Sequence, residues 1–310
     1  MIAPRVSVLM TAYNRERWVA DAIEGVLKQT LTDFELIIVD DRSTDGTAAI
    51  AAKYASGDSR VRLIVNERNL GDYANRNRAA EFATAPLMKY QDSDDLMYPH
   101  CLDVMVRMIE AQPDAGFGLS ASRQWPGGPC PMLLTPRMAY QREYLGGGLF
   151  FCGPSSAIFR TDVFRGLGGF VDRGAPSDYF FWLRACTRVN VALLPGDLFW
   201  YRVHEGQNQV SSKTEPASVA GEAWRALDAP QCPLTPSERE QARRNRAYYL
   251  AKRTWQDVRG GRVSVAWQRL RGAGLSVADW AKYLRPLRVD RMAGTPVHSD
   301  GEYVMPRWLS

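Results

Sequence analysis

The sequence predicts an α/β protein: a mixed, mostly parallel sheet flanked by helices, with a helical C-terminal extension. Short apolar runs alternate with helical patterns over residues 5–90, as in parallel strands joined by right-handed crossovers. The chain has 310 residues and 45% hydrophobic content, enough to bury one substantial core. Beyond about residue 213 the strand pattern stops. Prolines then mark an expected linker to Arg-rich helical segments.

Four apolar runs are expected to be strands, and the chain between them is expected to be helical. The strands are 6–10, 34–39, 61–65 and 87–90. The clearest helix is 18–28, because its apolar residues recur at helical spacing. A second helix should start near Asp45 or Thr47, and a third should cover about 72–83. A ligand is then expected at the edge where the parallel strands end.

Polar residues that follow these strands suit a nucleotide. An exposed Tyr13 can stack on a base, Asp41 can accept a hydrogen bond from a base N–H, and Arg76 can pair with a diphosphate. Each also has a structural explanation: Tyr13 can be a packing residue, and Asp40 or Asp41 a turn or helix-cap residue. Their shared position at strand ends favours the binding role.

Three carboxylates, Asp92, Asp94 and Asp95, lie within four positions directly after the fourth strand. Like charges packed this closely raise one another's pKa unless a cation lies among them. The cluster therefore indicates either a divalent metal site or a solvated acidic turn.

The next part of the chain departs from simple alternation. A helix is expected over about 99–111 and a strand over 115–121. The turn-rich segments 125–131 and 146–148 are expected to be loops that border a second substrate. Residues 150–160 are expected to pair as an antiparallel strand. A tight chain reversal is expected at 168–170, after a short helix.

Two further residues are candidates by position. Asp178 lies in the first turn of an aromatic helix expected over 177–188. A carboxylate at this position can also have a purely structural role, because its negative charge stabilises the N-terminus of the helix. His204 closes the second of two expected strands, 189–194 and 198–203. A lone histidine at a strand end is more often a hydrogen-bonded structural residue than a metal ligand.

The net charge of +5 belongs to the C-terminal third. Residues 1–214 carry 23 Lys and Arg against 24 Asp and Glu, whereas residues 215–310 carry 16 against 10. Helices are expected at about 237–259, 263–271 and 277–284, with tyrosines and tryptophans interspersed. Packing of a helical hairpin on the core is the default interpretation. A homo-oligomer contact or a peripheral membrane patch is the alternative.

Cysteine usage and hydropathy bear on location. The five cysteines are odd in number, widely spaced and never in a Cys-x-x-Cys pair, so neither a disulfide framework nor a zinc site is expected. No uninterrupted apolar run reaches about 18 residues. We therefore expect a cytoplasmic protein, soluble or peripheral at the inner face of the membrane, that does not bind nucleic acid.

Three segments taken together closely resemble the family 2 glycosyltransferases of GT-A fold. They are Val6 to Asn14, Ile38 to Thr47 and Gln91 to Asp95. Asn69-Leu70-Gly71 with Arg76-Asn77 resembles the family's segment beside the donor diphosphate. Gly168-Gly169-Phe170 with Ser177-Asp178-Tyr179 resembles its acceptor-side segment. The resemblance covers roughly residues 4–212 and leaves the tail unexplained.

The resemblance assigns a role to each candidate residue. It implies that Thr11, Tyr13 and Asp41 hold the nucleoside, and that Arg76 contacts the diphosphate. Asp92, Ser93 and Asp94 form the Asp-x-Asp motif, with Asp92 on the donor side. It also implies a Mn²⁺ or Mg²⁺ ion whose candidate ligands are Asp94, Asp95 and His204. Asp178 is the expected catalytic base, although the family usually has Glu-Asp where this chain has Ser177-Asp178.

These roles together predict an inverting, metal-dependent transfer of a sugar from a nucleotide-diphospho-sugar, with UDP the expected nucleotide. The metal would neutralise the leaving diphosphate, and Asp178 would take the proton of an acceptor hydroxyl on a carbohydrate or lipid-linked acceptor. The expected division is a catalytic domain over 1–213, with a nucleotide-sugar half (1–98) and an acceptor half (99–213), then a basic helical extension over 214–310.

Two other functions compete with this prediction. A nucleotidyltransferase would also need carboxylates and a divalent ion, but the first strand lacks the Gly-rich, basic phosphate cradle typical of that chemistry. A non-catalytic nucleotide-sugar-binding or scaffold protein is favoured by the lost Glu at Ser177 and opposed by the retained Asp178.

Overall fold

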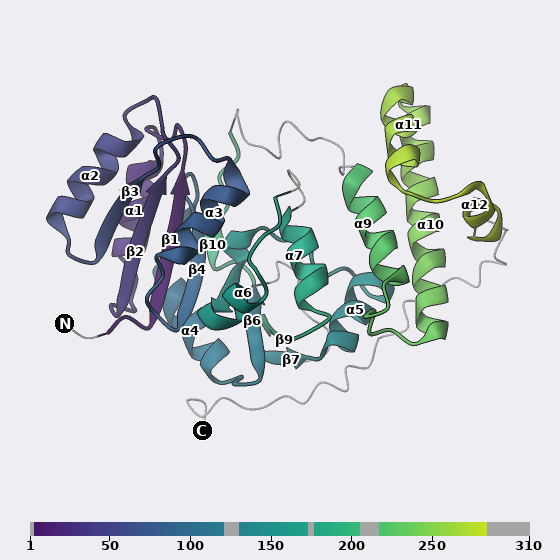
Figure 1. Cartoon of the computed structure of the whole chain (residues 1–310), viewed down its shortest axis with the longest axis horizontal. Helices are drawn as coiled ribbons and strands as arrows, with labels where there is room; N and C mark the ends of the chain where they lie inside the picture. The colour runs from purple at the N-terminus through teal and green to yellow at the C-terminus, as the bar shows by residue number, and fades with distance from the viewer. Residues whose placement is uncertain (1–2, 121–129, 173–176, 205–216, 284–310) are drawn as a thin grey trace.

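The computed structural model describes residues 3–120, 130–172, 177–204 and 217–283, and it confirms the predicted fold class (Figure 1). Eight strands form one mixed sheet in the order β3-β2-β1-β4-β8-β6-β9-β7. Their bounds are β1 Val6–Ala12, β2 Phe34–Asp40, β3 Val61–Val65, β4 Leu87–Asp92, β6 Ala115–Ser120, β7 Met132–Leu134, β8 Ala157–Arg160 and β9 Asn190–Leu194. A separate antiparallel pair joins β5 Leu96–Met97 to β10 Phe199–Trp200.

Helices cover both faces of the sheet and continue into the C-terminal region (Figure 1). Their bounds are α1 Val19–Leu27, α2 Thr47–Gly57, α3 Asp72–Glu81, α4 Cys101–Glu110, α5 Pro136–Leu145, α6 Thr161–Gly166, α7 Ser177–Ala185, α9 Ala217–Asp228, α10 Pro236–Arg259, α11 Val263–Gly272 and α12 Val277–Tyr283, with a 3₁₀ turn η1 at Pro154–Ser156.

The four expected N-terminal strands form the parallel half of the sheet. β1 lies between β2 and β4, and all three run in the same direction. Alternate residues of β1 enter different cores: Leu9 packs in one, while Val8 and Met10 pack in the other. A strand buried on both faces is uniformly apolar, which is why these runs are readable from sequence. The parallel order ends at β4, whose other neighbour, β8, is antiparallel to it.

The antiparallel strand expected over 150–160 is correct in direction but too long. Only Ala157–Arg160 pairs, because Pro154 begins the turn η1 and a proline has no N–H to donate to a ladder. The expected loops border a helix that the sequence pattern does not indicate, α5. Pro136 occupies its first turn, where proline is tolerated, and the Thr135 side chain caps Met138 N. Residues 121–129 lie outside the described part.

The expected linker after residue 213 is wrong in part, because it contains α9. Val219, Ala223 and Leu227 of that helix belong to the same hydrophobic core as Phe181 of α7. The Tyr144 hydroxyl donates to Ala223 O (2.8 Å). α9 therefore belongs to the same hydrophobic core as α7. In the described residues, no helix is both long enough and apolar enough to cross a bilayer.

The long helix α10 confirms the expected C-terminal helices and begins with a capping box. The Thr235 side chain caps Glu238 N, and the Glu238 carboxylate accepts from Thr235 N. Hydrogen bonds from Arg137 hold the pKa of Glu238 at about 2 and join α10 to α5. At its other end, Asp257 forms ion pairs with Arg262 and Arg269 that fix the turn into α11.

Candidate active site at the C-terminal edge of the parallel strands

The polar strand ends meet at one edge of the sheet, as expected from parallel topology. Thr11 at the end of β1 is in register with Asp92 at the end of β4. The Ser93 hydroxyl donates to Thr11 O (2.9 Å), and Asn66 N after β3 donates to Asp40 O (2.9 Å). Residues separated by up to about 80 positions therefore form one polar surface.

Asp41 anchors the loop after β3. It is 2% exposed, and its carboxylate accepts from Asn66 Nδ2 (2.8 Å), Leu70 N (2.8 Å) and Gly71 N (2.9 Å). A carboxylate has about four lone-pair positions, so one remains for a further donor such as a base N–H. Asp40 behaves differently, because both of its oxygens accept from Ser43. The turn interpretation is therefore correct for Asp40.

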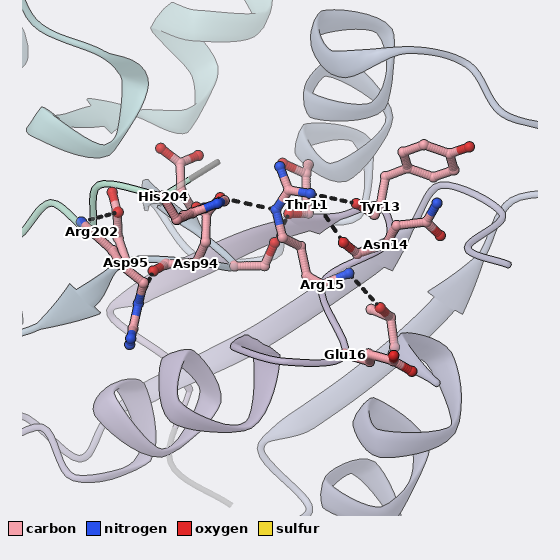
Figure 2. Close-up of polar contacts among 12 residues, drawn as sticks. Thr11, Tyr13, Asn14, Arg15, Glu16, Asp94, Asp95, Arg202 and His204 are labelled. Atoms are coloured by element: carbon pink, nitrogen blue, oxygen red, sulfur yellow. Dashed lines mark hydrogen bonds and ion pairs between the residues drawn. The ribbon is translucent and has the colours of Figure 1, made fainter. Parts of the chain in front are cut away.

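Tyr13 follows β1 and is 44% exposed, so its ring is free to stack on a planar ligand. The next residue, Asn14, has φ 53°, and its side chain accepts from Thr44 N (2.8 Å). This left-handed conformation turns the chain away from the sheet. Figure 2 shows the Tyr13 ring at the opposite end of the polar cluster from Asp94 and His204.

Asp92 lies between two halves of the fold. Its Oδ1 accepts from Arg76 Nη2 of α3 (2.7 Å), and its Oδ2 accepts from Ser155 Oγ of η1 (2.7 Å). Burial acts to raise its pKa, but the Arg76 charge and both hydrogen bonds outweigh burial and hold the pKa below its ordinary value. Asp92 is thus an ionised carboxylate held in one orientation.

Arg76 is 8% exposed and also bonds Asp72 through Nε (2.8 Å). Its Nη1 has no hydrogen-bond partner in the described part of the chain. A buried guanidinium N–H without an acceptor is costly, and an anionic ligand oxygen is a suitable acceptor for it. The diphosphate role of Arg76 stays a prediction, and its Nη1 is the atom available for such an oxygen.

Asp94 and His204 meet directly at the acidic turn (Figure 2). His204 Nε2 lies 3.0 Å from Asp94 Oδ2, and Arg15 Nε donates to the same oxygen (2.9 Å). The His204 ring stacks on Trp18, with ring centroids 3.9 Å apart. The strand expected over 198–203 is shorter than predicted, but β10 pairs with β5. Two residues after β10, Arg202 Nε donates to Asp94 O (2.8 Å).

Asp95 is turned away from this contact. It is 1% exposed, its Oδ1 accepts from Arg202 N (3.0 Å), and its Oδ2 has no hydrogen-bond partner among the described residues. Burial and the neighbouring Asp92 charge raise its pKa to about 8. A positive charge near the turn would reverse this shift.

The three predicted metal ligands fit this geometry only in part. Within residues 3–120, 130–172, 177–204 and 217–283, no three His, Cys, Asp or Glu side chains are arranged to hold one metal ion. Of the three, only Asp94 and His204 come together. Mg²⁺ sites commonly use one or two protein carboxylates together with substrate phosphates. The pair, with the orphaned Asp95 Oδ2 nearby in sequence, therefore fits an ion whose remaining ligands come from a bound diphosphate.

Asp178 occupies the first turn of α7, as predicted. Tyr179 N donates to its Oδ1 (2.7 Å), and the Tyr73 hydroxyl of α3 also hydrogen-bonds it. Burial raises the pKa of Asp178 to about 6, although these hydrogen bonds and the Arg76 charge act in the opposite direction. A carboxylate with this pKa is ionised at neutral pH and is more basic than an ordinary aspartate.

The chain reversal before α7 is fixed by α3. Asn77 Nδ2 donates to Phe170 O (2.7 Å), and Phe170 N donates back to Asn77 Oδ1 (2.9 Å). Gly169 has φ 62°, and a Cβ added there would lie 2.5 Å from Asn77 Oδ1. The reversal therefore requires glycine for both conformation and space.

We expect Gly169→Ala to lower the free energy of unfolding by at least about 2 kcal/mol, from the left-handed backbone and the Asn77 clash together. Denaturant unfolding followed by circular dichroism measures this. The matched control is Gly166→Ala, because a Cβ added at Gly166 would meet nothing within 4 Å. Equal midpoints for the two variants would contradict the role of Gly169.

Several contributors were not predicted from the sequence. Arg15, which donates to Asp94, lies two positions after Tyr13. A cation so close to the end of a strand could have been recognised in the sequence as a site residue. Lys89, 0% exposed within an apolar strand, donates to Ser155 O (2.9 Å), and a lone charge in such a run was another signal. Ser155 and Tyr73 gave no signal, because only tertiary packing brings them to Asp92 and Asp178.

Comparison with known proteins relates this geometry to a family. The family model described as Glycosyl transferase family 2 matches residues 7–168, slightly more than half of the chain. The chain is 35% identical over 104 residues to the UDP-Glc:alpha-D-GlcNAc-diphosphoundecaprenol beta-1,3-glucosyltransferase WfgD of Escherichia coli, covering 34% of this chain and 40% of WfgD. The chain thus aligns with about two fifths of the length of the first curated relatives it matches.

Solved structures show the same fold. TarS 1-349 of S. aureus in complex with UDP-GlcNAc superposes with a TM-score of 0.63 at 20% identity, covering 86% of this chain and 79% of TarS. The mannosyltransferase PcManGT of Pyrobaculum calidifontis in complex with GDP-Man and Mn²⁺ gives a TM-score of 0.60 at 18% identity, covering 91% and 79%. These likenesses, at such low identity, concern the fold alone.

Proposed function

Because the chain belongs to glycosyl transferase family 2, we propose that it transfers a sugar from a nucleotide-diphospho-sugar to an acceptor hydroxyl with inversion at the anomeric carbon. UDP is the proposed nucleotide, and the product belongs to a polysaccharide, glycolipid or other glycoconjugate. WfgD uses UDP-Glc and TarS was solved with UDP-GlcNAc, which supports this choice, whereas PcManGT was solved with GDP-Man.

The proposed donor site uses the half of the fold formed by residues 1–98. The exposed Tyr13 stacks on the base, and the free lone pair of Asp41 accepts from a base N–H. The orphaned Nη1 of Arg76 supports its contact with the diphosphate. We assign Thr11, Ser93 and Asp92 to the donor ribose. Arg76 and Ser155 already hold the ionised Asp92 carboxylate in one orientation, which supports this role.

We propose that Asp94 and His204 hold a Mn²⁺ or Mg²⁺ ion. Asp95 is the third candidate ligand, and its Oδ2 has no hydrogen-bond partner among the described residues. When bound, such an ion neutralises the charge that develops on the leaving diphosphate. Arg15 pairs with Asp94 Oδ2 and holds the Asp94 carboxylate in place. The Mn²⁺ in PcManGT supports a metal of this class.

Asp178 supports the proposal most directly, because burial raises the pKa of its carboxyl group to about 6, which suits a general base on the proposed acceptor side. Its carboxylate takes the acceptor O–H proton as that oxygen bonds to the anomeric carbon and the carbon–oxygen bond to the diphosphate breaks. One displacement at one carbon inverts its configuration. No covalent sugar–enzyme intermediate is then needed. The acceptor half, residues 99–213, presents this base.

The direct test is donor turnover by the purified chain. We expect UDP-sugar, Mn²⁺ and an acceptor to give UDP and a product whose anomeric configuration, read by NMR, is opposite to that of the donor. A retained configuration would overturn inversion. Tight donor binding without hydrolysis or transfer to any acceptor would instead favour the scaffold alternative.

Nucleotide choice has its own measurement. We expect UDP with Mn²⁺ to raise the melting temperature more than GDP with Mn²⁺ at equal concentration, because a ligand that binds only the folded state stabilises it. A larger shift of the melting temperature with GDP would indicate a guanine nucleotide donor in place of UDP. The proposed transfer chemistry would stay unchanged. Comparing Tyr13→Ala with Tyr54→Ala, a tyrosine on α2, would show whether the shift depends on base stacking.

A further inference from the structure

The C-terminal half of α10 presents an outer face that the proposed chemistry does not use. Its inner face is buried through Ala242, Ala247 and Leu250, and through the ion-paired Asp257. The outer face carries four residues at positions i, i+4, i+7 and i+11, which is the spacing of one helical stripe. These four residues, called the α10 stripe below, are Tyr248, Lys252, Trp255 and Arg259.

The α10 stripe alternates aromatic and basic side chains, and all of them reach solvent. Tyr248 is 61% exposed and Trp255 is 63% exposed. Lys252 and Arg259 are both exposed, and within the described residues neither forms an ion pair or a side-chain hydrogen bond. Large exposed aromatics are costly to leave in water, and unpaired cations beside them attract anions.

The surroundings of the stripe are strongly positive. Residues 241–283 contain ten Lys and Arg against two Asp. One of these, Asp257, is 5% exposed and already bonded to Arg262 and Arg269. The other, Asp279, caps its own helix through Ser276. Arg243, Arg244 and Lys282 are paired with Asp228 and Glu240, whereas Lys252 and Arg259 are the cations of the stripe itself.

We propose that the α10 stripe docks on an anionic lipid bilayer. Tyrosine and tryptophan rings have an apolar body and a polar tip, which suits the headgroup region, and Lys and Arg alongside them pair with lipid phosphates. A second copy of this chain is a poorer occupant, because a symmetric contact would place Lys252 and Arg259 against their own equivalents.

The remaining C-terminal segment is a poorer occupant for a related reason. Residues 284–310 contain four Arg against three acidic residues, so they offer no net negative charge to the stripe. An anionic bilayer supplies both the negative charge and the apolar–polar boundary that the stripe matches.

The position of α10 connects this surface to the candidate active site. In Figure 1 β1 and α10 lie at opposite ends of the long axis, and the C-terminal ends of both point toward the top of the view. Arg246 Nη2, two residues before the stripe, lies 3.5 Å from the Tyr179 hydroxyl, and Tyr179 follows Asp178. Docking would hold the acceptor side near the bilayer and favour a lipid-linked acceptor. This last step rests on the proposed function.

The test is co-sedimentation of the full chain with vesicles of phosphatidylcholine alone or with about 30% phosphatidylglycerol, without donor or acceptor. We expect binding only to the anionic vesicles, and we expect it to weaken as NaCl rises from about 50 to about 500 mM. Each juxtamembrane cation contributes about 1 kcal/mol, so Lys252→Glu/Arg259→Glu should lower the partition coefficient at least about tenfold. Lys53→Glu, an exposed site on α2, is the charge-matched control and should bind like wild type.

Aromatic variants assign the surface. Trp255→Ser should weaken vesicle binding several-fold, while Trp267→Ser, a similarly exposed tryptophan on α11, should not. Circular dichroism checks that each variant is folded. Absence of wild-type binding at low salt, or loss with Trp267→Ser alone, overturns the proposal. So does vesicle-independent self-association that Trp255→Ser abolishes. Donor turnover measured without vesicles does not depend on membrane binding, so its failure would count against the proposed function and not against membrane docking.

Discussion

Asp178→Asn is expected to lower the rate of sugar transfer by roughly 10²–10⁴, the usual contribution of a positioned general base. Asparagine keeps the size of the side chain and can still accept from Tyr179 N, but it cannot take a proton. The loss should appear in kcat with little change in donor affinity, because the proposed role of Asp178 is to take a proton from the acceptor and not to bind the donor. Single-turnover transfer with saturating UDP-sugar measures it.

Asp162→Asn is the matched control for that variant. Asp162 is an exposed aspartate in the first turn of α6, the helix preceding α7, so it reproduces the chemical change away from the edge. It should transfer at the wild-type rate. Wild-type kcat in Asp178→Asn would assign the base to another residue.

The same base predicts the pH profile. Burial raises the pKa of Asp178 to about 6, and only the carboxylate form accepts a proton. The transfer rate should therefore rise about tenfold per pH unit below this pKa and level off above it. An ordinary aspartate, with a pKa near about 4, would give a rate already level at about pH 5. A rate that stays level down to about pH 5 would thus contradict either the raised pKa of Asp178 or its assignment as the general base.

Asp94→Asn is expected to cause the second large loss, about 10²–10³ in transfer rate, because a divalent ion at a leaving diphosphate contributes several kcal/mol. The variant keeps an acceptor for Arg15 Nε but loses the negative charge that faces His204. The concentration of Mn²⁺ needed for the half-maximal transfer rate should be higher for Asp94→Asn than for the wild-type chain. EDTA should abolish wild-type transfer.

Calorimetry gives a readout independent of turnover. UDP should bind the wild-type chain more weakly when Mn²⁺ is omitted, and this difference should shrink in Asp94→Asn. Asp103→Asn serves as the control, because Asp103 pairs with Arg107 on the outer face of α4. If EDTA and Asp94→Asn both leave transfer unchanged, the metal role is wrong.

The sequence by itself determined the parallel half of the fold and the edge at which its polar strand ends meet. Strands such as β1 and β2 are buried on both faces, so they appear as continuous apolar runs. Parallel topology brings the C-terminal ends of such strands together, whatever the details of packing. Position at these strand ends was therefore sufficient to single out Asp92 and Asp94 as candidates, whereas Asp178 was assigned its role through the family resemblance.

Tertiary structure alone decided which partners those residues have. Ser155 reaches Asp92 across 63 positions, and Arg15 reaches Asp94 across 79, through packing that leaves no periodic trace in the chain. It also decided that α9, which lies in the expected linker, is part of the core, because its apolar face packs with α7. Long-range contacts depend on shape and burial, whereas local patterns report only which face of each element is apolar. Burial is likewise what raises the pKa of Asp178 to about 6.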